Sequence, residues 1–248
     1  MRLFVYISYK GTNYHGWQFQ NNAISVQQEI TESLQILLKN KSLSIMGSGR
    51  TDAGVHAKQQ VFHVDIPDGT EIKNLMFRLN GILQNDIIIN HIDIVPASAH
   101  ARFDAIRRSY EYHLRLKKTP FGENEYYYHR NPLDFEAMNE ASNYLLGEQD
   151  FKSFSRVKTE VNNFVCTITK AQWELNEDKA IFYISANRFL RSMVRSIVGT
   201  LLEVGEGKIK PEEVIKIIEK KDRRVAGRSV PAQGLYLCKV EYPPFKSN

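Results

Sequence analysis

Polar and apolar residues follow two different periods along the chain, and each period predicts one kind of element. In the first half, alternating positions and short apolar runs predict four strands, at residues 3–9, 43–46, 60–66 and 87–95. Apolar residues spaced three and four apart predict two helices, at residues 25–40 and 72–83. The resulting order, strand–helix–strand–strand–helix–strand, is the split βαββαβ pattern of ferredoxin-like domains.

The second half of the chain alternates between the same two periods. Strands are predicted at residues 108–116, 167–175, 180–187 and 234–242. Helices are predicted at residues 134–146, from about residue 190, and at residues 211–220. The 248-residue chain is therefore predicted to contain two similar α/β halves, residues 1–104 and 105–248. A cleft between two such halves is a natural place for a site.

Composition narrows the class of protein. The N-terminal apolar stretch turns polar at Ser8, which is too early for a signal peptide. No apolar run approaches the roughly 18 residues needed to span a bilayer. We therefore expect a cytoplasmic protein with no membrane association. In that compartment the two cysteines, Cys166 and Cys238, are expected to be reduced and packed thiols.

Positive charge is concentrated in one part of the sequence. The formal net charge of +5 is weak evidence alone, because many proteins without a polyanionic partner are mildly basic. Eight basic residues lie close together: Lys208, Lys210, Lys216, Lys220, Lys221, Arg223, Arg224 and Arg228. They could contact phosphates, although a solvated helix face with interspersed glutamates explains them nearly as well.

The segment richest in candidate chemistry is the glycine-punctuated stretch at residues 47–57. Its glycines indicate a shaped loop, but it lacks the third glycine of a dinucleotide fingerprint and the Gly-Lys-Ser/Thr of a Walker loop. It presents Asp52 two residues after Arg50, whose guanidinium favours the ionised carboxylate. Such a turn is by itself more often structural. Asp52, His56 and His63 have no metal-ligand spacing, so no metal site is predicted.

This loop resembles the signature of the tRNA pseudouridine synthase A family. Further blocks that resemble the family occur in the right order almost end to end, at residues 9–18, 101–103, 108–112, 147–154, 189–205 and 234–242. The resemblance implies a fold of two α/β halves whose antiparallel sheets join around a central catalytic cleft. It also implies a homodimer, no cofactor and no metal. The implied substrate is uridine at positions 38, 39 and 40 of the tRNA anticodon stem-loop.

The resemblance also assigns roles to individual residues. Asp52 takes the place of the catalytic aspartate and Arg50 that of the arginine beside it. Tyr110 matches the tyrosine that stacks on the target base, Arg195 a basic residue near the aspartate, and Leu235 a residue lining the pocket. One departure is visible in the sequence, and it concerns a position expected to touch RNA or the surface. There Cys166 stands where the family pattern predicts arginine.

The reaction implied by the resemblance suits a single carboxylate. Breaking the glycosidic bond builds positive character on the ribose, which Asp52 can stabilise, capture or relieve by removing a proton. The detached base is itself the next nucleophile, so a second carboxylate to activate water is not needed. Trp17 could stack on RNA, but packing against the catalytic loop is the preferred interpretation. Two alternatives stay open at this point: a non-catalytic RNA-binding module and a nucleoside hydrolase.

Overall fold

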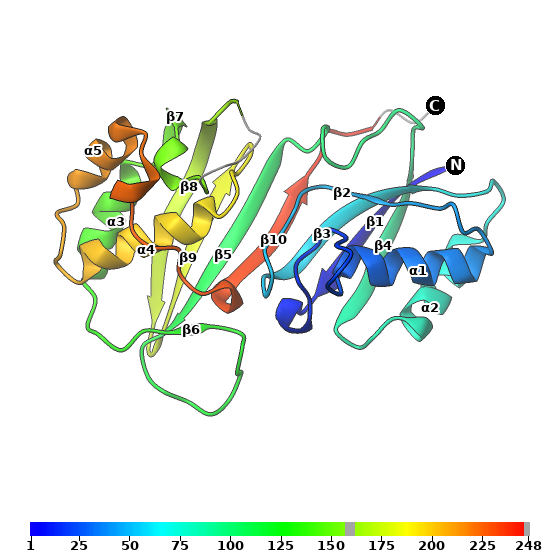
Figure 1. Cartoon of the computed structure of the whole chain (residues 1–248), viewed down its shortest axis with the longest axis horizontal. Coiled ribbons are helices and arrows are strands. Elements are labelled where there is room, and N and C mark those ends of the chain that lie inside the picture. Colours follow the sequence, from blue (N-terminus) through cyan, green and yellow to red (C-terminus); the bar gives the residue numbers. More distant parts are fainter. Residues whose placement is uncertain (157–161, 246–248) are drawn as a thin grey trace. The chain divides into compact units, whose positions relative to one another are not determined.

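The computed structural model describes residues 1–156 and 162–245. These residues contain ten strands and five α-helices, so the α+β prediction is confirmed. They form two compact units, which are shown in Figure 1. Unit 1 comprises residues 1–106 and 236–248, and unit 2 comprises residues 107–235. No helix among the described residues has the length and apolar character that a membrane span requires.

Unit 1 is built on an antiparallel sheet in which β1 lies between β3 and β4. The short β2 pairs antiparallel with β3, and β10 pairs parallel with β3 at His56 and Ala57. In chain order the elements are β1 (Arg2–Tyr9), η1 (Gly11–Asn13), α1 (Val26–Leu38), β2 (Met46–Gly47), β3 (His56–Asp65), α2 (Ile72–Ile82), β4 (Ile87–Val95) and β10 (Leu235–Glu241).

Helices α1 and α2 lie next to each other in unit 1 (Figure 1) and contribute to its core. Helix α1 begins after Ser25, whose hydroxyl accepts a hydrogen bond from the Gln28 amide at 3.2 Å, as expected of a good N-cap. It ends at Lys39, which adopts φ 51°. Removing the apolar stripe from water supplies most of the stability of this helix, since short helices are marginal alone. The fully buried aliphatic side chains include Leu3, Ile7, Ile30, Leu34 and Leu79.

Unit 2 has an antiparallel sheet of order β5-β9-β8-β7, and β6 pairs parallel with the end of β5. Helix α4 is buried along most of its length, which matches its strongly apolar stripe. In chain order the elements are β5 (Arg107–Arg115), β6 (Tyr127–Tyr128), α3 (Phe135–Asn143), β7 (Gly147–Asp150), η2 (Lys152–Phe154), β8 (Val165–Asn176), β9 (Lys179–Ala186), α4 (Met193–Gly205), α5 (Glu213–Lys220), η3 (Arg223–Val225) and η4 (Ala232–Gly234).

The differences from the predicted elements have local causes. The predicted strand at residues 43–46 is reduced to β2, because only Met46 and Gly47 pair with β3. Helix α4 begins at Met193 and not near residue 190, because Ser192 adopts φ 60°. Strands β6 and β7 were not predicted, since two residues and the polar sequence GEQD carry no apolar alternation.

Candidate active site

Asp52 lies in a loop of unit 1 whose backbone is fixed on both sides of the carboxylate. The Trp17 amide donates to the Thr51 carbonyl at 3.3 Å, and the Gly54 amide donates to the Tyr14 carbonyl at 3.2 Å. The Tyr9 hydroxyl and the Thr51 hydroxyl are 2.8 Å apart. The residues on either side of Asp52 are thus held by the segment that follows β1, while Asp52 itself remains partly exposed.

Close backbone contact explains why a glycine, Gly16, occurs in the segment that follows β1. Gly16 adopts φ 87°, and a Cβ there would overlap the Thr51 carbonyl oxygen. Trp17 is 2% exposed, and its indole lies so close to Gly47 that a Cβ on Gly47 would overlap the ring. The interpretation that Trp17 packs against the loop is confirmed. The block at residues 9–18 therefore builds the support of the Asp52 loop.

Polar contacts fix the first part of the loop. Buried Ser48 donates to Gln60, and the Gln60 amide donates to the Gly49 carbonyl at 3.0 Å. Arg50 is exposed, and its Nε donates to Gln18 Oε1 at 3.2 Å. Arg50 and Asp52 thus share one loop, with Arg50 anchored to the supporting segment at residues 9–18.

The neighbouring histidines have structural contacts. His56 Nδ1 accepts from the Gly11 amide at 3.0 Å, which places its proton on Nε2, and its ring stacks on Tyr236 at 4.7 Å. His63 Nδ1 accepts from the Ala101 amide at 3.1 Å, and burial lowers the pKa of His63 to about 4. No group of three or more potential metal ligands occurs within the part of the chain that the structure describes.

In unit 2, the strand β5 carries two tyrosines with different environments. Tyr112 is fully buried, and its hydroxyl donates to the Pro231 carbonyl at 2.8 Å. Burial also raises the pKa of Tyr112. Tyr110 remains partly exposed and packs edge to face on Phe189, with ring centroids 5.1 Å apart. Tyr112 is therefore the core residue of the pair, whereas the Tyr110 ring keeps accessible surface.

Arg195 is tied by two hydrogen bonds to the segment that leads into β10. Its Nε donates to the Val230 carbonyl at 2.7 Å, and the Val230 amide donates back to the Arg195 carbonyl at 3.2 Å. The same segment contains Leu235, which is 6% exposed at the start of β10. Tyr110, Arg195 and Leu235 all belong to unit 2, whereas Arg50 and Asp52 belong to unit 1.

The expectation about the position of Cys166 needs correction. Cys166 is 0% exposed, so the prediction that this position touches RNA or the surface is wrong. In β8 the inward-facing positions include Cys166 and Ile168, and burial raises the pKa of the Cys166 thiol to about 11. An arginine there would have to bury its charge. Both cysteines are free thiols, and of the two expected to be packed, Cys166 is buried and Cys238 is half-buried.

Most of the arginines in the basic stretch have structural contacts. Arg223 donates to the Ala226 carbonyl at 3.0 Å and to the Ser229 hydroxyl at 3.3 Å. Arg224 is bound to Asp222, with a shortest distance of 2.6 Å, and this pairing lowers the pKa of Asp222 to about 2. The Arg223 contacts lie within the turn that follows α5, whereas Arg224 is an exposed arginine in a surface ion pair.

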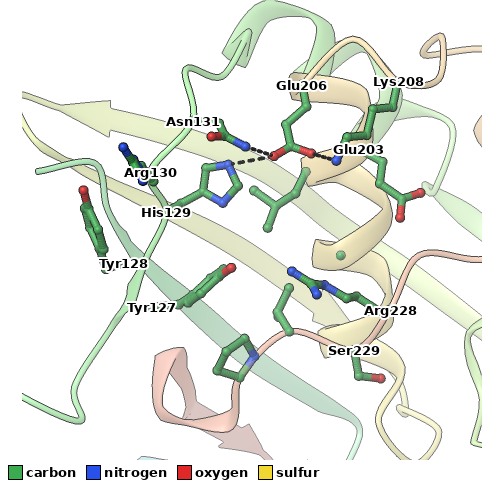
Figure 2. A pocket seen from close by; sticks show the side chains of 14 residues that line it. Tyr127, Tyr128, His129, Arg130, Asn131, Glu203, Glu206, Lys208, Arg228 and Ser229 are labelled. Carbon is green, nitrogen blue, oxygen red and sulfur yellow. Dashed lines mark hydrogen bonds and ion pairs between the residues drawn. The ribbon is translucent and has the colours of Figure 1, made fainter.

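Unit 2 also contains a pocket of about 780 Å³ that was not foreseen from the sequence. It lies between the segment after β5, the second half of α4 and residues 228–231 (Figure 2). Its polar lining includes Tyr127, His129, Asn131, Glu206 and Arg228. The basic stretch was the only sequence signal for this site, because the other lining residues are far apart in the chain.

Comparison with known proteins gives one consistent answer. A family model described as tRNA pseudouridine synthase matches residues 141–243. The chain is 47% identical over 242 residues to a protein named tRNA pseudouridine synthase A from Azobacteroides pseudotrichonymphae, covering 98% of this chain and 97% of the relative. A protein of the same name from Bacillus subtilis is 40% identical over 245 residues, covering 98% and 99%.

Proposed function

Because the chain belongs to the tRNA pseudouridine synthase A family, we propose that it isomerises uridine to pseudouridine in tRNA, with Asp52 as the catalytic carboxylate. The observation that carries this proposal is the construction of the Asp52 loop. The backbone on both sides of Asp52 is held by hydrogen bonds, and Gly16 lies in contact with Thr51. Asp52 nevertheless keeps exposed surface. A fixed backbone that presents an accessible carboxylate suits a group that must meet a substrate atom.

The chemistry proposed for Asp52 follows from the bonds that change. The bond from ribose C1′ to uracil N1 breaks, a bond from C1′ to C5 forms, and the hydrogen on C5 leaves as a proton. Asp52 attacks C1′ or removes a proton from C2′, and either path relieves the positive character on the sugar. Arg50 and Arg195 support the site, Tyr110 stacks on the target base, and Leu235 lines the pocket.

The proposal extends to the substrate and the assembly. The substrate is the anticodon stem-loop of tRNA, with uridines at positions 38, 39 and 40 as targets, and the protein is cytoplasmic. The fold is that of two ferredoxin-like halves, residues 1–104 with the Asp52 loop and residues 105–248, around the central cleft implied by the family resemblance. The active form is a homodimer that needs no cofactor and no metal.

Mapping pseudouridine in a tRNA transcript after incubation with the purified protein tests the substrate. A transcript with uridine at positions 38, 39 and 40 should gain pseudouridine there. A matched transcript with cytidine at those three positions and compensating stem changes should gain none. Modification only elsewhere in the tRNA would overturn the anticodon assignment and leave the reaction class intact.

Light scattering tests the assembly separately. A homodimer at micromolar concentration should have twice the 28.7 kDa mass of the chain. A single 28.7 kDa species under conditions that support activity would overturn the dimer.

A further inference from the structure

The pocket in unit 2 has one end where Asn131 and Lys208 engage the Glu206 carboxylate. Glu206 accepts a hydrogen bond from Asn131 at 2.8 Å and pairs with Lys208 at 2.5 Å. His129 Nε2 lies 3.3 Å from the same carboxylate without a hydrogen bond to it or to any other described residue. Burial lowers the pKa of His129, which keeps its ring neutral near pH 7. Figure 2 shows this group at one side of the pocket, where it forms a wall.

The other end of the pocket presents hydrogen-bond donors that are not engaged. The Tyr127 hydroxyl and the Arg228 guanidinium point toward each other in Figure 2. Neither side chain makes a hydrogen bond or an ion pair with residues 1–156 or 162–245. The second carboxylate of the lining, Glu203, interacts electrostatically with Arg223. A ligand at this end therefore meets donors and positive charge.

Arg228 is presented from a backbone that is locked onto α4. A Cβ on Gly199 would overlap the Arg228 carbonyl oxygen, and the Gly227 amide donates to the Thr200 hydroxyl at 2.8 Å. The hydroxyl of Ser229, the residue after Arg228, lies 3.0 Å from the Ser196 hydroxyl on α4. A guanidinium on a fixed backbone loses less entropy on binding than one on a mobile loop.

Tyr127 is fixed in a similar way from the opposite wall. It pairs with Leu114 in the parallel ladder between β5 and β6, and its ring packs edge to face on His129 with centroids 6.0 Å apart. The His129 amide donates to the Arg115 carbonyl at 2.9 Å, which holds the chain after β6. Tyr127 and Arg228 thus come from two separately anchored segments.

We propose that this pocket binds one phosphodiester group of the tRNA, between the Arg228 guanidinium and the Tyr127 hydroxyl. This inference rests on the proposed function for the identity of the nucleic acid. A phosphodiester carries one negative charge and two free oxygens, which match a forked guanidinium and one phenol. The carbonyl oxygens of Val230 and Pro231, in the pocket wall, accept hydrogen bonds from Arg195 and Tyr112. The phosphate subsite is therefore built on the same segment that orients Arg195.

The test combines a protein substitution with a substitution in the RNA. Arg228→Gln should weaken binding of an anticodon stem-loop about tenfold and reduce the log–log salt slope by about 0.7–0.9, the value of one phosphate. Replacing phosphates one at a time by neutral methylphosphonates should weaken wild-type binding at each contacted phosphate, and the effect at one of these positions should depend on Arg228. Replacement of that one phosphate should weaken binding to Arg228→Gln much less than binding to the wild type, because only the contact with the Tyr127 hydroxyl remains to be affected.

Two further variants separate this site from general charge effects. Tyr127→Phe should weaken binding about threefold with an unchanged salt slope, because a phenol releases no counterion. Arg78→Gln removes an equal charge from an exposed arginine on α2 and should show no coupling to that phosphate. Thermal melting of each variant checks that it is folded.

The inference would be overturned if every methylphosphonate weakened binding to Arg228→Gln as much as binding to the wild type. It would also be overturned if Arg78→Gln reduced the effect of the same methylphosphonate equally. A pocket that binds only free phosphate would show no methylphosphonate effect that depends on Arg228, so this result would reject the inference as well. Pseudouridine formation by the wild-type protein on the same RNA is read independently. If the wild type forms none, the proposed function fails, whatever the binding data show.

Discussion

The Asp52 loop in unit 1 and the segment at residues 227–235 in unit 2 are both held rigid, but by different forces. Trp17 packs its ring on Gly47 behind the Asp52 loop, and glycines allow the backbones to touch. In the segment at 227–235, the Gly227 amide donates to the Thr200 hydroxyl, and the Val230 and Pro231 carbonyls accept from Arg195 and Tyr112. The buried Trp17 ring therefore adds to the hydrogen bonds that hold the first segment, whereas buried polar contacts and close glycine contacts support the second.

This difference matters because the two kinds of support respond differently to substitution. Loss of a buried ring removes transfer free energy and leaves a cavity. Loss of one buried hydroxyl costs less, unless its partner stays unsatisfied. The loop expected to carry the chemistry is thus supported by the larger individual contribution, and the segment next to the phosphate subsite by several smaller ones.

The largest expected effect is on chemistry and belongs to the loop. Asp52→Asn keeps the shape and removes the charge, so turnover should fall on the order of 10³-fold or more. Binding of tRNA should stay within about threefold, because phosphate contacts dominate RNA affinity. Single-turnover assays and filter binding measure the two effects. Appreciable activity in Asp52→Asn would remove Asp52 from its catalytic role, and Asp52→Ala should behave alike.

The second effect concerns Tyr110, whose ring and hydroxyl can be separated. Tyr110→Leu should reduce the single-turnover rate by about 10²-fold, because stacking recovers roughly 1–3 kcal/mol of the cost of flipping a base. Tyr110→Phe keeps the ring, so RNA binding should stay near wild type while product formation slows. Full speed in Tyr110→Phe would assign the residue to stacking alone. Full speed in both variants would exclude it from the site.

The third effect is on the free energy of unfolding, and it differs between a variant of the first segment and a variant of the second. Trp17→Ala should lower the free energy of unfolding by about 3–5 kcal/mol. Thr200→Val, which removes the hydroxyl that accepts from Gly227, should lower it by about 1–3 kcal/mol. Denaturant titrations followed by circular dichroism measure both values. A larger loss of unfolding free energy in Thr200→Val than in Trp17→Ala would contradict the larger contribution of the buried ring.

The smallest effect is a pH dependence. The folded-state pKa of His63 is lowered to about 4 from 6.5, so the unfolded chain binds more protons between these values. The contribution of His63 is fully present above pH 6.5 and is lost as the pH falls toward 4. It amounts to about 1–3 kcal/mol. His63→Asn should flatten the fall in melting temperature between pH 7 and pH 5, and an unchanged profile would contradict the assignment.

Much of the fold follows from local pattern. Strand β4 was predicted with its observed bounds, because alternation and apolar runs coincide there. Alternation within β8 places Cys166 and Ile168 on the same inner face. The expectation of a surface or RNA contact at Cys166 came from the arginine of the family pattern. The Asp52 loop was identified because its residues are contiguous. Its support by Gly16 and Trp17 depends on distances between segments, which no local pattern contains.

The phosphate subsite shows the limit of sequence reasoning more clearly. Eight basic residues lie close together in the sequence, but their side chains have different surroundings in the structure. Arg223 and Arg224 are engaged by neighbours, whereas Arg228 lines the pocket. Tyr127 stands about a hundred residues earlier in the chain. The close packing of Gly199 and Gly227 fixes Arg228 against α4, and pairing with Leu114 fixes Tyr127 on β5, so neither placement is visible in a local sequence pattern.

The central claim is isomerisation at C5 of uridine, and tritium release tests it most directly. An anticodon stem-loop labelled with tritium on uridine C5 is incubated with the wild-type protein, and the product nucleosides are separated. The account predicts one tritium released for each pseudouridine formed, with no free uracil. Release of free uracil would indicate a hydrolase, and tight RNA binding without tritium release would indicate a binding module. Either result would contradict the account.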